Sequence, residues 1–196
     1  KTLLFPYEGG DALWVVDNGR ARIRPVVTGF ENDRYVVIDS GLEPGERVLV
    51  NGATGGVGSA LVQLARHRGA HVTAVCRGAN VAWVLALGAH EALDYTEQDF
   101  ARGQERYDVI FDVAGTAPYA RSRGALRPGG RLVLLFPRMR DVAAVPWIHA
   151  TSGHRIFNGT AVGLKEHLEL LARLAEEGCY RPPIHAVFPL EEISEA

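Results

Sequence analysis

A glycine-rich segment between a short apolar run and a longer amphipathic one constrains this chain more than any other feature. Residues 47–50 (Arg-Val-Leu-Val) are typical of a buried strand, and residues 57–68 carry apolar side chains at helical spacing. Between them lies Asn51-Gly-Ala-Thr-Gly-Gly-Val-Gly58. Such a turn after a strand and before a helix predicts an α/β domain whose helix N-terminus presents backbone N–H groups to an anion.

The residues of this turn are the first candidates for binding the pyrophosphate of a dinucleotide. Gly55 and Gly56 let the backbone approach phosphates, and Gly58 lets the helix pack closely on the strand. Ala53 stands where the pattern G-x-G-x-x-G has its first glycine, so the strict pattern is broken. The alternative interpretation is a tight strand-to-helix turn without a ligand. The predicted contacts in the turn are Ala53, Thr54, Gly55, Gly56, Val57 and Gly58.

Strands and helices alternate from residue 46 to the end of the chain. The apolar runs predict strands over 47–50, 71–76, 92–95, 107–113 and 131–136. The helical patterns cover 57–68, 81–87, 118–126 and 164–177, and a last helix is expected to begin at Leu190. Short connections between these elements imply right-handed crossovers. We therefore expect a doubly wound parallel sheet of the Rossmann type over residues 46–196.

The first 45 residues have a different pattern, without a helix. Ala12–Val16 and Arg20–Thr28 are β-rich and flank Asn18-Gly19, a strong signal for a hairpin turn. Residues 34–39 add another strand. We expect a small antiparallel β unit over residues 1–45, with a domain boundary near residues 41–46.

The end of the second strand decides which nicotinamide cofactor fits best. An acidic residue there would accept hydrogen bonds from the ribose 2′-OH of NADH and repel the 2′-phosphate of NADPH. Residues 76–80 read Cys-Arg-Gly-Ala-Asn and contain no carboxylate. Arg77 can donate to a phosphate, so NADPH is favoured over NADH. The alternative is that Arg77 is a solvated loop side chain.

Composition excludes several function classes. The net charge of -2, with 47% hydrophobic and 22% charged residues, gives no reason to expect nucleic acid or an anionic membrane surface as a partner. No apolar run approaches the roughly 20 residues that a membrane span requires. The two cysteines, Cys76 and Cys179, and the scattered histidines give no metal-ligand spacing, so no metal is expected. We expect a cytoplasmic protein.

Seven segments share their order and spacing with one protein superfamily. They are Pro44–Val50, Asn51–Gly58, Leu87–Ala89, Leu93–Thr96, Tyr107–Val113, Leu126–Leu132 and Pro189–Ile193. From about Gly41 to Ala196 the chain resembles the medium-chain dehydrogenase/reductase superfamily. Within it, the chain is most similar to the zinc-independent, zeta-crystallin-like quinone oxidoreductase branch. That branch tolerates alanine at the position of Ala53.

The resemblance implies further cofactor contacts. It places Tyr95 close to the 2′-phosphate, although Tyr95 could instead only cap its strand. Asn80 stands where relatives often carry lysine, and Arg77 can compensate for that lost charge. The residues that border the ribose and the nicotinamide are then Val113, Ala114, Gly115, Leu135 and Phe136.

The activity implied by the resemblance is hydride transfer from NADPH to a small molecule, a quinone or an enone-like carbonyl compound. The family also implies a homodimer. No catalytic acid or base can be assigned: Tyr119, His149 and His154 are considered, but a structural role is favoured for each. The substrate-binding barrel domain of the family is missing from this sequence, which leaves turnover by this chain alone in question.

Residues from about Leu13 to Gly45 resemble a different protein class, the membrane-proximal β domain of periplasmic adaptor proteins of efflux pumps. The likeness depends on Ala12–Ala21, Arg24–Gly29 and Ser40–Val48. Both families can contain Leu-x-Pro-Gly-x-Arg-Val, so Leu42–Val48 is a natural crossover point. The hypothesis is a recombined or fused chimera. The alternative function is then a non-catalytic nucleotide-binding or assembly module.

Overall fold

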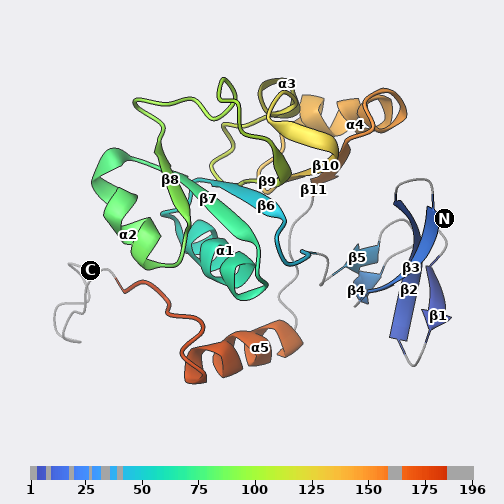
Figure 1. The fold of residues 1–196 in the computed structure, drawn as a ribbon, viewed down its shortest axis with the longest axis horizontal. Helices are drawn as coiled ribbons and strands as arrows, with labels where there is room; N and C mark the ends of the chain where they lie inside the picture. Colours follow the sequence, from blue (N-terminus) through green and yellow to red (C-terminus); the bar gives the residue numbers. More distant parts are fainter. Residues whose placement is uncertain are drawn as a thin grey trace. The chain divides into compact units, whose positions relative to one another are not determined.

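The computed structural model describes residues 4–7, 10–17, 20–26, 28–31, 36–38, 42–158 and 165–184 (Figure 1). For the strands before residue 42 it describes the backbone. The chain divides into two compact units, Lys1–Leu42 and Glu43–Ala196, and each unit forms its own β-sheets.

The first unit contains two small antiparallel sheets. Strands β1 (Leu4–Tyr7), β2 (Gly10–Asp17) and β3 (Arg20–Val26) form one sheet in that order, and β4 (Thr28–Glu31) pairs with β5 (Val36–Ile38). The β2–β3 register pairs Asp17 with Arg20, which confirms the hairpin predicted around Asn18-Gly19. Strands β1 and β4 were not predicted. The described residues of this unit form no helix.

A six-stranded sheet forms the centre of the second unit. Its strands are β6 (Arg47–Asn51), β7 (His71–Cys76), β8 (Glu91–Asp94), β9 (Tyr107–Asp112), β10 (Leu126–Leu134) and β11 (Arg155–Asn158). Every pairing is parallel, and the order is β11-β10-β9-β6-β7-β8. This order confirms the predicted doubly wound sheet, because the chain leaves β6 in one direction and returns to its other side with β9.

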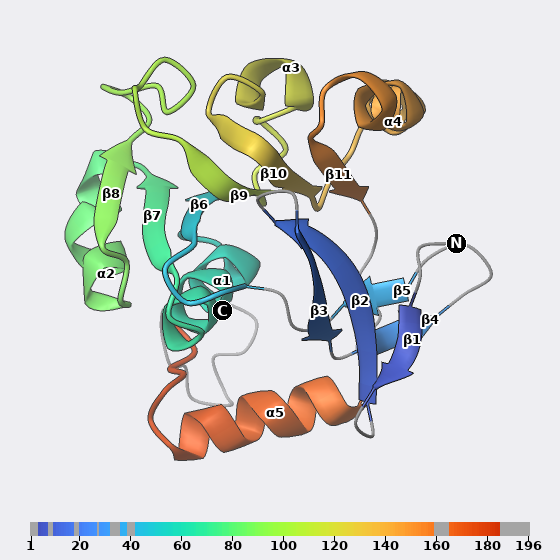
Figure 2. The same cartoon turned by 45° about the vertical axis from the view of Figure 1, so that its right-hand side comes forward.

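Helices cover both faces of this sheet. Helices α1 (Gly56–His67) and α2 (Val81–Ala86) pack on one face, and α3 (Tyr119–Ser122) and α4 (Met139–Thr151) lie on the other (Figures 1 and 2). A 3-10 turn, η1 (Gly78–Asn80), precedes α2. The last described helix is α5 (Lys165–Glu176), and the segment after it is attached to α1. Gln63 of α1 donates to the Arg181 carbonyl at 3.0 Å and accepts the Arg181 N–H at 2.8 Å.

Several predicted elements differ from the observed ones. The helix expected over 118–126 is only the four residues of α3, because β10 already begins at Leu126, with a register irregularity between Leu126 and Arg131. Helix α4 and strand β11 were not predicted. Helix α4 contains Pro146, and a proline inside a helical pattern normally signals an end or a kink. The helix expected from Leu190 lies outside the described residues.

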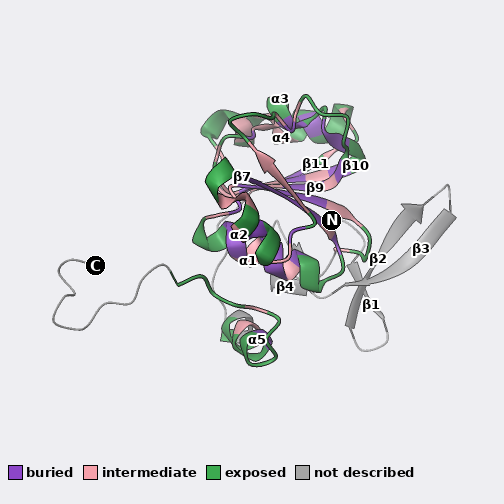
Figure 3. Cartoon of the chain, turned by 60° about the vertical axis from the view of Figure 1, so that its left-hand side comes forward, coloured by how far each residue is buried: buried purple, intermediate pink, exposed green. Residues whose placement is uncertain are grey.

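The core lies between the sheet and its helices. Val48, Leu49 and Val50 of β6 are fully buried, as expected for a central strand covered on both faces. Figure 3 shows buried residues along the strands of this sheet. Helix α1 buries Gly58, Ser59, Val62, Gln63 and Ala65. Val57, which contributed to the helical pattern in the sequence, is 50% exposed. The spacing therefore predicted the helix correctly, although Val57 at its start faces solvent.

A basic cluster lies where β7 and β8 begin, at the opposite edge from the strand ends. His90 Nδ1 accepts the Val72 N–H at 3.0 Å, its ring stacks on His71 with centroids 4.3 Å apart, and Arg66 contacts its Nε2. Burial lowers the pKa of His90, Arg66 and His71 lower it further, and Glu91 opposes them.

Candidate cofactor site

The structure brings the predicted cofactor contacts to one edge of the sheet. All of them follow the carboxyl ends of β6 to β10, and these ends share an edge because the strands are parallel. The change of direction in strand order occurs at β6, which pairs with β7 on one side and β9 on the other. Ligands of open α/β sheets bind at such a switch point, outside the carboxyl ends of the strands.

The turn after β6 owes its shape to glycines. Gly52 has φ +90°, and a Cβ on it would lie 3.0 Å from the Ala114 Cβ. A Cβ on Gly58 would lie only 2.1 Å from the Gly52 carbonyl oxygen, so α1 can pack this closely only with glycine there. A Cβ on Gly56 would meet nothing within 4 Å. The turn is thus tight toward the protein and open on the outer side at Gly56.

Ala53 lies on the inner side of this turn. Its side chain is fully buried, and its N–H donates to the Val75 carbonyl at 3.1 Å, beside the Gly52 N–H at 3.2 Å. These bonds attach the turn to the end of β7. A methyl group at position 53 therefore points into the core and leaves the outer side of the turn free, which explains why the first glycine of the strict pattern is dispensable here.

The N-terminus of α1 is open to solvent. Gly55 is its N-cap, no side chain caps it, and its first turn holds no acidic residue. Gly55, Gly56 and Val57 are exposed. The first N–H groups of a helix have no partner within the helix and carry partial positive charge. This end of α1 can therefore bind an anion, and the buried Gly58 fixes its position against the strand.

A buried polar network supports the loop after β9, and the sequence analysis missed it. Asp112 accepts hydrogen bonds from Asn51 Nδ2 at 2.8 Å, the Thr116 N–H at 3.2 Å and the Ala117 N–H at 2.8 Å. Asn51 also donates to Thr116 Oγ1 at 2.9 Å. The Val113 N–H adds a bond to the Asn51 carbonyl at 3.0 Å. The network joins the ends of β6 and β9 at the switch point and shapes the loop that begins with Val113.

The loop residues after β9 and β10 lie beside one another. The Leu135 N–H donates to the Asp112 carbonyl at 3.1 Å. Gly115 has φ +69°, and a Cβ on it would lie 3.7 Å from the Phe136 Cβ. Ala114 is exposed, and so is 67% of Phe136. Together with Val113, these residues form a partly apolar border next to the glycine turn.

The loops after β7 and β8 carry the residues predicted to contact the ribose and its 2′-phosphate. Arg77 is exposed and stands at the N-cap of η1, which ends at the partly exposed Asn80. Tyr95 is 56% exposed, and its N–H donates to the Cys76 carbonyl at 3.1 Å. Residues 76–80 contain no acid, but the structure brings one to them from the next strand. The carboxylate of Asp94, at the end of β8, lies against Gly78.

The candidate catalytic residues have structural partners. Tyr119 Oη and His154 Nδ1 are 3.1 Å apart, and His149 Nε2 accepts the Ile156 N–H at 2.8 Å. These bonds connect α3 and α4 to the segment of β11, so they favour the structural role. In the part of the chain that the structure describes, no three His, Cys, Asp or Glu side chains gather closely enough to hold a metal ion.

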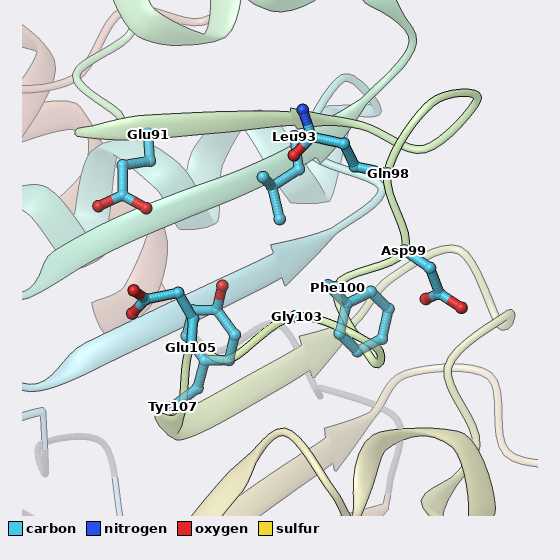
Figure 4. A pocket seen from close by; sticks show the side chains of 8 residues that line it. All are labelled: Glu91, Leu93, Gln98, Asp99, Phe100, Gly103, Glu105 and Tyr107. Atoms are coloured by element: carbon cyan, nitrogen blue, oxygen red, sulfur yellow. The ribbon is translucent and has the colours of Figure 1, made fainter.

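A small cavity of about 140 Å³ lies between β8, β9 and the loop that connects them (Figure 4). Glu91 at the start of β8 and Tyr107 at the start of β9 line it, together with Glu105 and other residues of the connecting loop. None of its lining residues belongs to the predicted set of cofactor contacts.

None of the helices that the structure describes has both the length and the apolar character needed to cross a membrane.

Two family models match the chain. The model described as zinc-binding dehydrogenase matches residues 87–196, more than half of the chain. The model described as the C-terminal permuted SH3 domain of RND MFPs matches residues 6–54, about a quarter of it. The two matches do not overlap, and the second includes β6 and the first residues of the glycine turn.

Quinone oxidoreductases are among the relatives. The chain is 30% identical over 158 residues to a chloroplastic quinone oxidoreductase of Triphysaria versicolor, covering 78% of this chain and 48% of the relative. It is 28% identical over 182 residues to human quinone oxidoreductase, covering 85% and 54%. The quinone oxidoreductase structure from Coxiella burnetii superimposes with a TM-score of 0.67 at 28% identity, covering 77% and 47%.

The chain thus spans about half the length of these relatives. Because the family model covers more than half of the sequence, the chain belongs to the zinc-binding dehydrogenase family, within the medium-chain dehydrogenase/reductase superfamily.

Proposed function

We propose that residues 46–196 bind a nicotinamide dinucleotide at the carboxyl edge of the sheet and form the cofactor domain of an oxidoreductase. The observation that carries this proposal is the turn from Gly52 to Gly58. Its outer side is open at Gly56, and the adjoining helix N-terminus is uncapped and free of acidic residues. A pyrophosphate matches both properties, because it needs close backbone approach and N–H donors.

The residues present fit the rest of such a cofactor. The N–H groups at the start of α1 would hold the pyrophosphate, and the loop after β7 would face the adenosine ribose. The border formed by Val113, Ala114, Gly115, Leu135 and Phe136 would lie along the other ribose and the nicotinamide. The chemistry that this cofactor supplies when bound is hydride transfer. The exposed Phe136 ring offers apolar surface that would limit access of water to that end of the bound cofactor.

We favour NADPH over NADH as the cofactor. Arg77 and Tyr95 are both exposed at the end where the 2′-phosphate of NADPH would lie. A guanidinium pairs well with a phosphate, and a tyrosine hydroxyl can donate to it. Asn80 adds no charge, so Arg77 supplies the only positive side chain of residues 76–80.

The acceptor that we propose is a quinone or an enone-like carbonyl compound, reduced without zinc. The quinone oxidoreductase relatives support this substrate class. The chain spans about half of those relatives, so turnover is expected to depend on further substrate-binding structure. A homodimer and a cytoplasmic location stay predictions.

Nucleotide titration tests the proposal on the full chain. NADPH fluorescence is followed on titration, and quinone-dependent NADPH oxidation is then measured. Arg77→Ala should weaken NADPH binding by about tenfold and leave NADH binding nearly unchanged, since the lost contact is one charge-assisted phosphate interaction at an exposed site. Arg77→Glu should widen the difference between the losses of NADPH and NADH affinity, because the new carboxylate repels the 2′-phosphate.

Arg68→Ala is the matched control, because Arg68 is an exposed arginine at the far end of α1. It should change neither affinity. No binding of either nucleotide at millimolar concentration would refute the proposed function. Equal loss of NADPH and NADH affinity in Arg77→Ala would refute the 2′-phosphate contact alone.

We propose a non-catalytic assembly module as the second candidate, supported by the match of residues 6–54 to a domain of RND MFPs. In this case the chain is a chimera of two fold families, with the crossover near Leu42–Val48, and its β unit mediates assembly. Binding of NADPH without quinone-dependent oxidation, together with a discrete oligomer in light scattering, would support this candidate. Oxidation by a monomer would exclude it.

A further inference from the structure

Asp94 occupies a specific place at the end of β8. The β7–β8 register pairs Cys76 with Asp94, so Asp94 reaches the same edge as the loop that begins with Arg77. Its Oδ1 accepts the Thr96 N–H at 2.9 Å and the Thr96 hydroxyl at 2.8 Å. Its Oδ2 lies toward Gly78, where a Cβ would be only 2.3 Å away.

The Asp94 carboxylate therefore fills the space that a side chain at position 78 would need. The φ of Gly78 is not in the left-handed region, so backbone conformation does not require glycine there. A Cβ at this position would instead have to displace the Asp94 carboxylate. The Thr96 hydrogen bonds lower the pKa of Asp94 most, and the Gly78 N–H and the charge of Arg77 lower it further. The carboxylate is thus ionised at neutral pH and already interacts with the loop after β7.

The two groups on that loop are those that a 2′-phosphate would use. A phosphate in this position takes hydrogen bonds from backbone N–H groups and from a guanidinium. Here the Gly78 N–H already lies next to an internal anion, and the charge of Arg77 lowers the pKa of that anion, Asp94. A 2′-phosphate would compete with Asp94 for both, whereas a 2′-hydroxyl brings no negative charge.

We propose that Asp94 is a selectivity-determining residue whose carboxylate competes with a 2′-phosphate for the Gly78 N–H and for the charge of Arg77, and so limits the preference for NADPH over NADH. The inference depends on the proposed nicotinamide site. Asp94 acts on the cofactor choice through Arg77 and Gly78, so it is a positioning residue. It supplies from β8 the acid that Rossmann-type domains selective for NAD carry at the end of the second strand.

The test compares dissociation constants of NADPH and NADH on the full chain, measured by calorimetry without substrate. Asp94→Asn keeps an oxygen acceptor for Thr96 and removes the charge. It should tighten NADPH binding by about three- to tenfold, the size expected when one exposed charge no longer repels a phosphate, and should leave NADH binding nearly unchanged. The gain should shrink in 1 M salt.

Two control variants separate charge from structure. Thr96→Val removes the hydroxyl that donates to Asp94 and keeps the charge, so the ratio of the two constants should stay that of the unmodified chain. Glu91→Gln removes a carboxylate at the opposite end of β8 and should also leave the ratio unchanged.

An unchanged ratio in Asp94→Asn, with both nucleotides still bound by the unmodified chain, would overturn this inference and leave the proposed function standing. A parallel loss of both affinities would also overturn it, since that is the result of a purely structural role. If the unmodified chain binds neither nucleotide, the proposed function fails and this inference fails with it.

Discussion

The glycine turn allows a matched pair of substitutions that differ by two positions in one helix. Gly56→Ala and Gly58→Ala add the same methyl group to the first turn of α1, and neither glycine has a positive φ. The added Cβ at position 56 meets nothing within 4 Å, whereas the one at position 58 lies 2.1 Å from the Gly52 carbonyl oxygen and 2.9 Å from the Ala53 Cα.

The energetic consequences follow from these distances. Relief of the contact at position 58 requires the helix and the turn to separate by roughly 1 Å, because ordinary contacts begin near 3.4 Å. Overpacking of this kind costs about 1–3 kcal/mol, against a gain of up to about 1 kcal/mol from replacing a helical glycine by alanine. The contacted atoms are backbone, so the cost lies in the upper part of that range and the net loss is about 1–2 kcal/mol. Gly58→Ala should therefore lower Tm by about 2–8 °C. Gly56→Ala has no such contact and keeps only the gain in helix stability, so its Tm should stay the same or rise slightly.

Nucleotide binding should show a different pattern. If the pyrophosphate lies over the turn, the methyl group of Gly56→Ala occupies the space that the phosphates need. NADPH and NADH affinities should then fall together by at least about tenfold, since two charge-assisted N–H contacts are lengthened or lost. Gly58→Ala should weaken both nucleotides as well, because it moves the start of α1.

Thermal unfolding by circular dichroism and calorimetric titration of both nucleotides measure these effects. Unchanged Tm in Gly58→Ala would show that the close helix-to-strand contact is not needed. Full nucleotide affinity in a stably folded Gly56→Ala would refute the placement of the pyrophosphate, whatever the effect of Gly58→Ala.

Three further predictions concern other parts of the second unit. Asp112→Asn should lower the free energy of unfolding by about 1–3 kcal/mol, because an amide cannot accept all of the hydrogen bonds that the buried carboxylate receives. Urea titration measures this loss, and an unchanged free energy of unfolding would exclude a supporting role for the network. The pKa of His90 is lowered in the folded chain, so its contribution to stability is fully present above its ordinary pKa of 6.5 and is lost as the pH falls from there through the lowered pKa. A chain with His90→Gln should therefore lose less stability between pH 7 and 5, and identical pH profiles would contradict this. Gln63→Ala removes both hydrogen bonds to Arg181 and should speed hydrogen exchange of the backbone amides that follow α5. Mass spectrometry measures this exchange, and an unchanged rate would contradict the prediction.

The elements that could be predicted are those with a strong local pattern. The run Arg47–Val50, the glycine turn and the helix that follows agree in spacing, and residues 107–112 form a nearly continuous apolar strand. Helix α4 and strand β11 lack such patterns, since Pro146 interrupts one and the other is only four residues long. The buried side of α1 depends on how the helix is rotated on the sheet, which the position of Gly58 decides.

The site was predictable only where its residues are close in sequence. The glycine turn is one continuous segment, so its motif marks it. Asp94 and Asp112 contribute through side chains that reach loops or strands elsewhere in the chain. Which strand ends are neighbours is decided by strand order and register, as in the pairing of Cys76 with Asp94. A sequence can place an acid at the end of a strand, but only the sheet shows which loop it meets.

The pairing of β6 with β9 has a consequence for how this unit acquires its structure during synthesis. Of the six strands of this sheet, β6 is synthesised first, yet it lies in the middle of the sheet. Its Asn51 donates a hydrogen bond to Asp112, which lies 61 residues later in the chain. The edge of β6 that pairs with β9 keeps its backbone N–H and C=O groups unpaired until β9 has been made. Such long-range parallel pairing is slow to form and exposes strand edges meanwhile. A ribosome stalled before residue 112 should therefore present an aggregation-prone or chaperone-bound chain, and release past β9 should end that dependence.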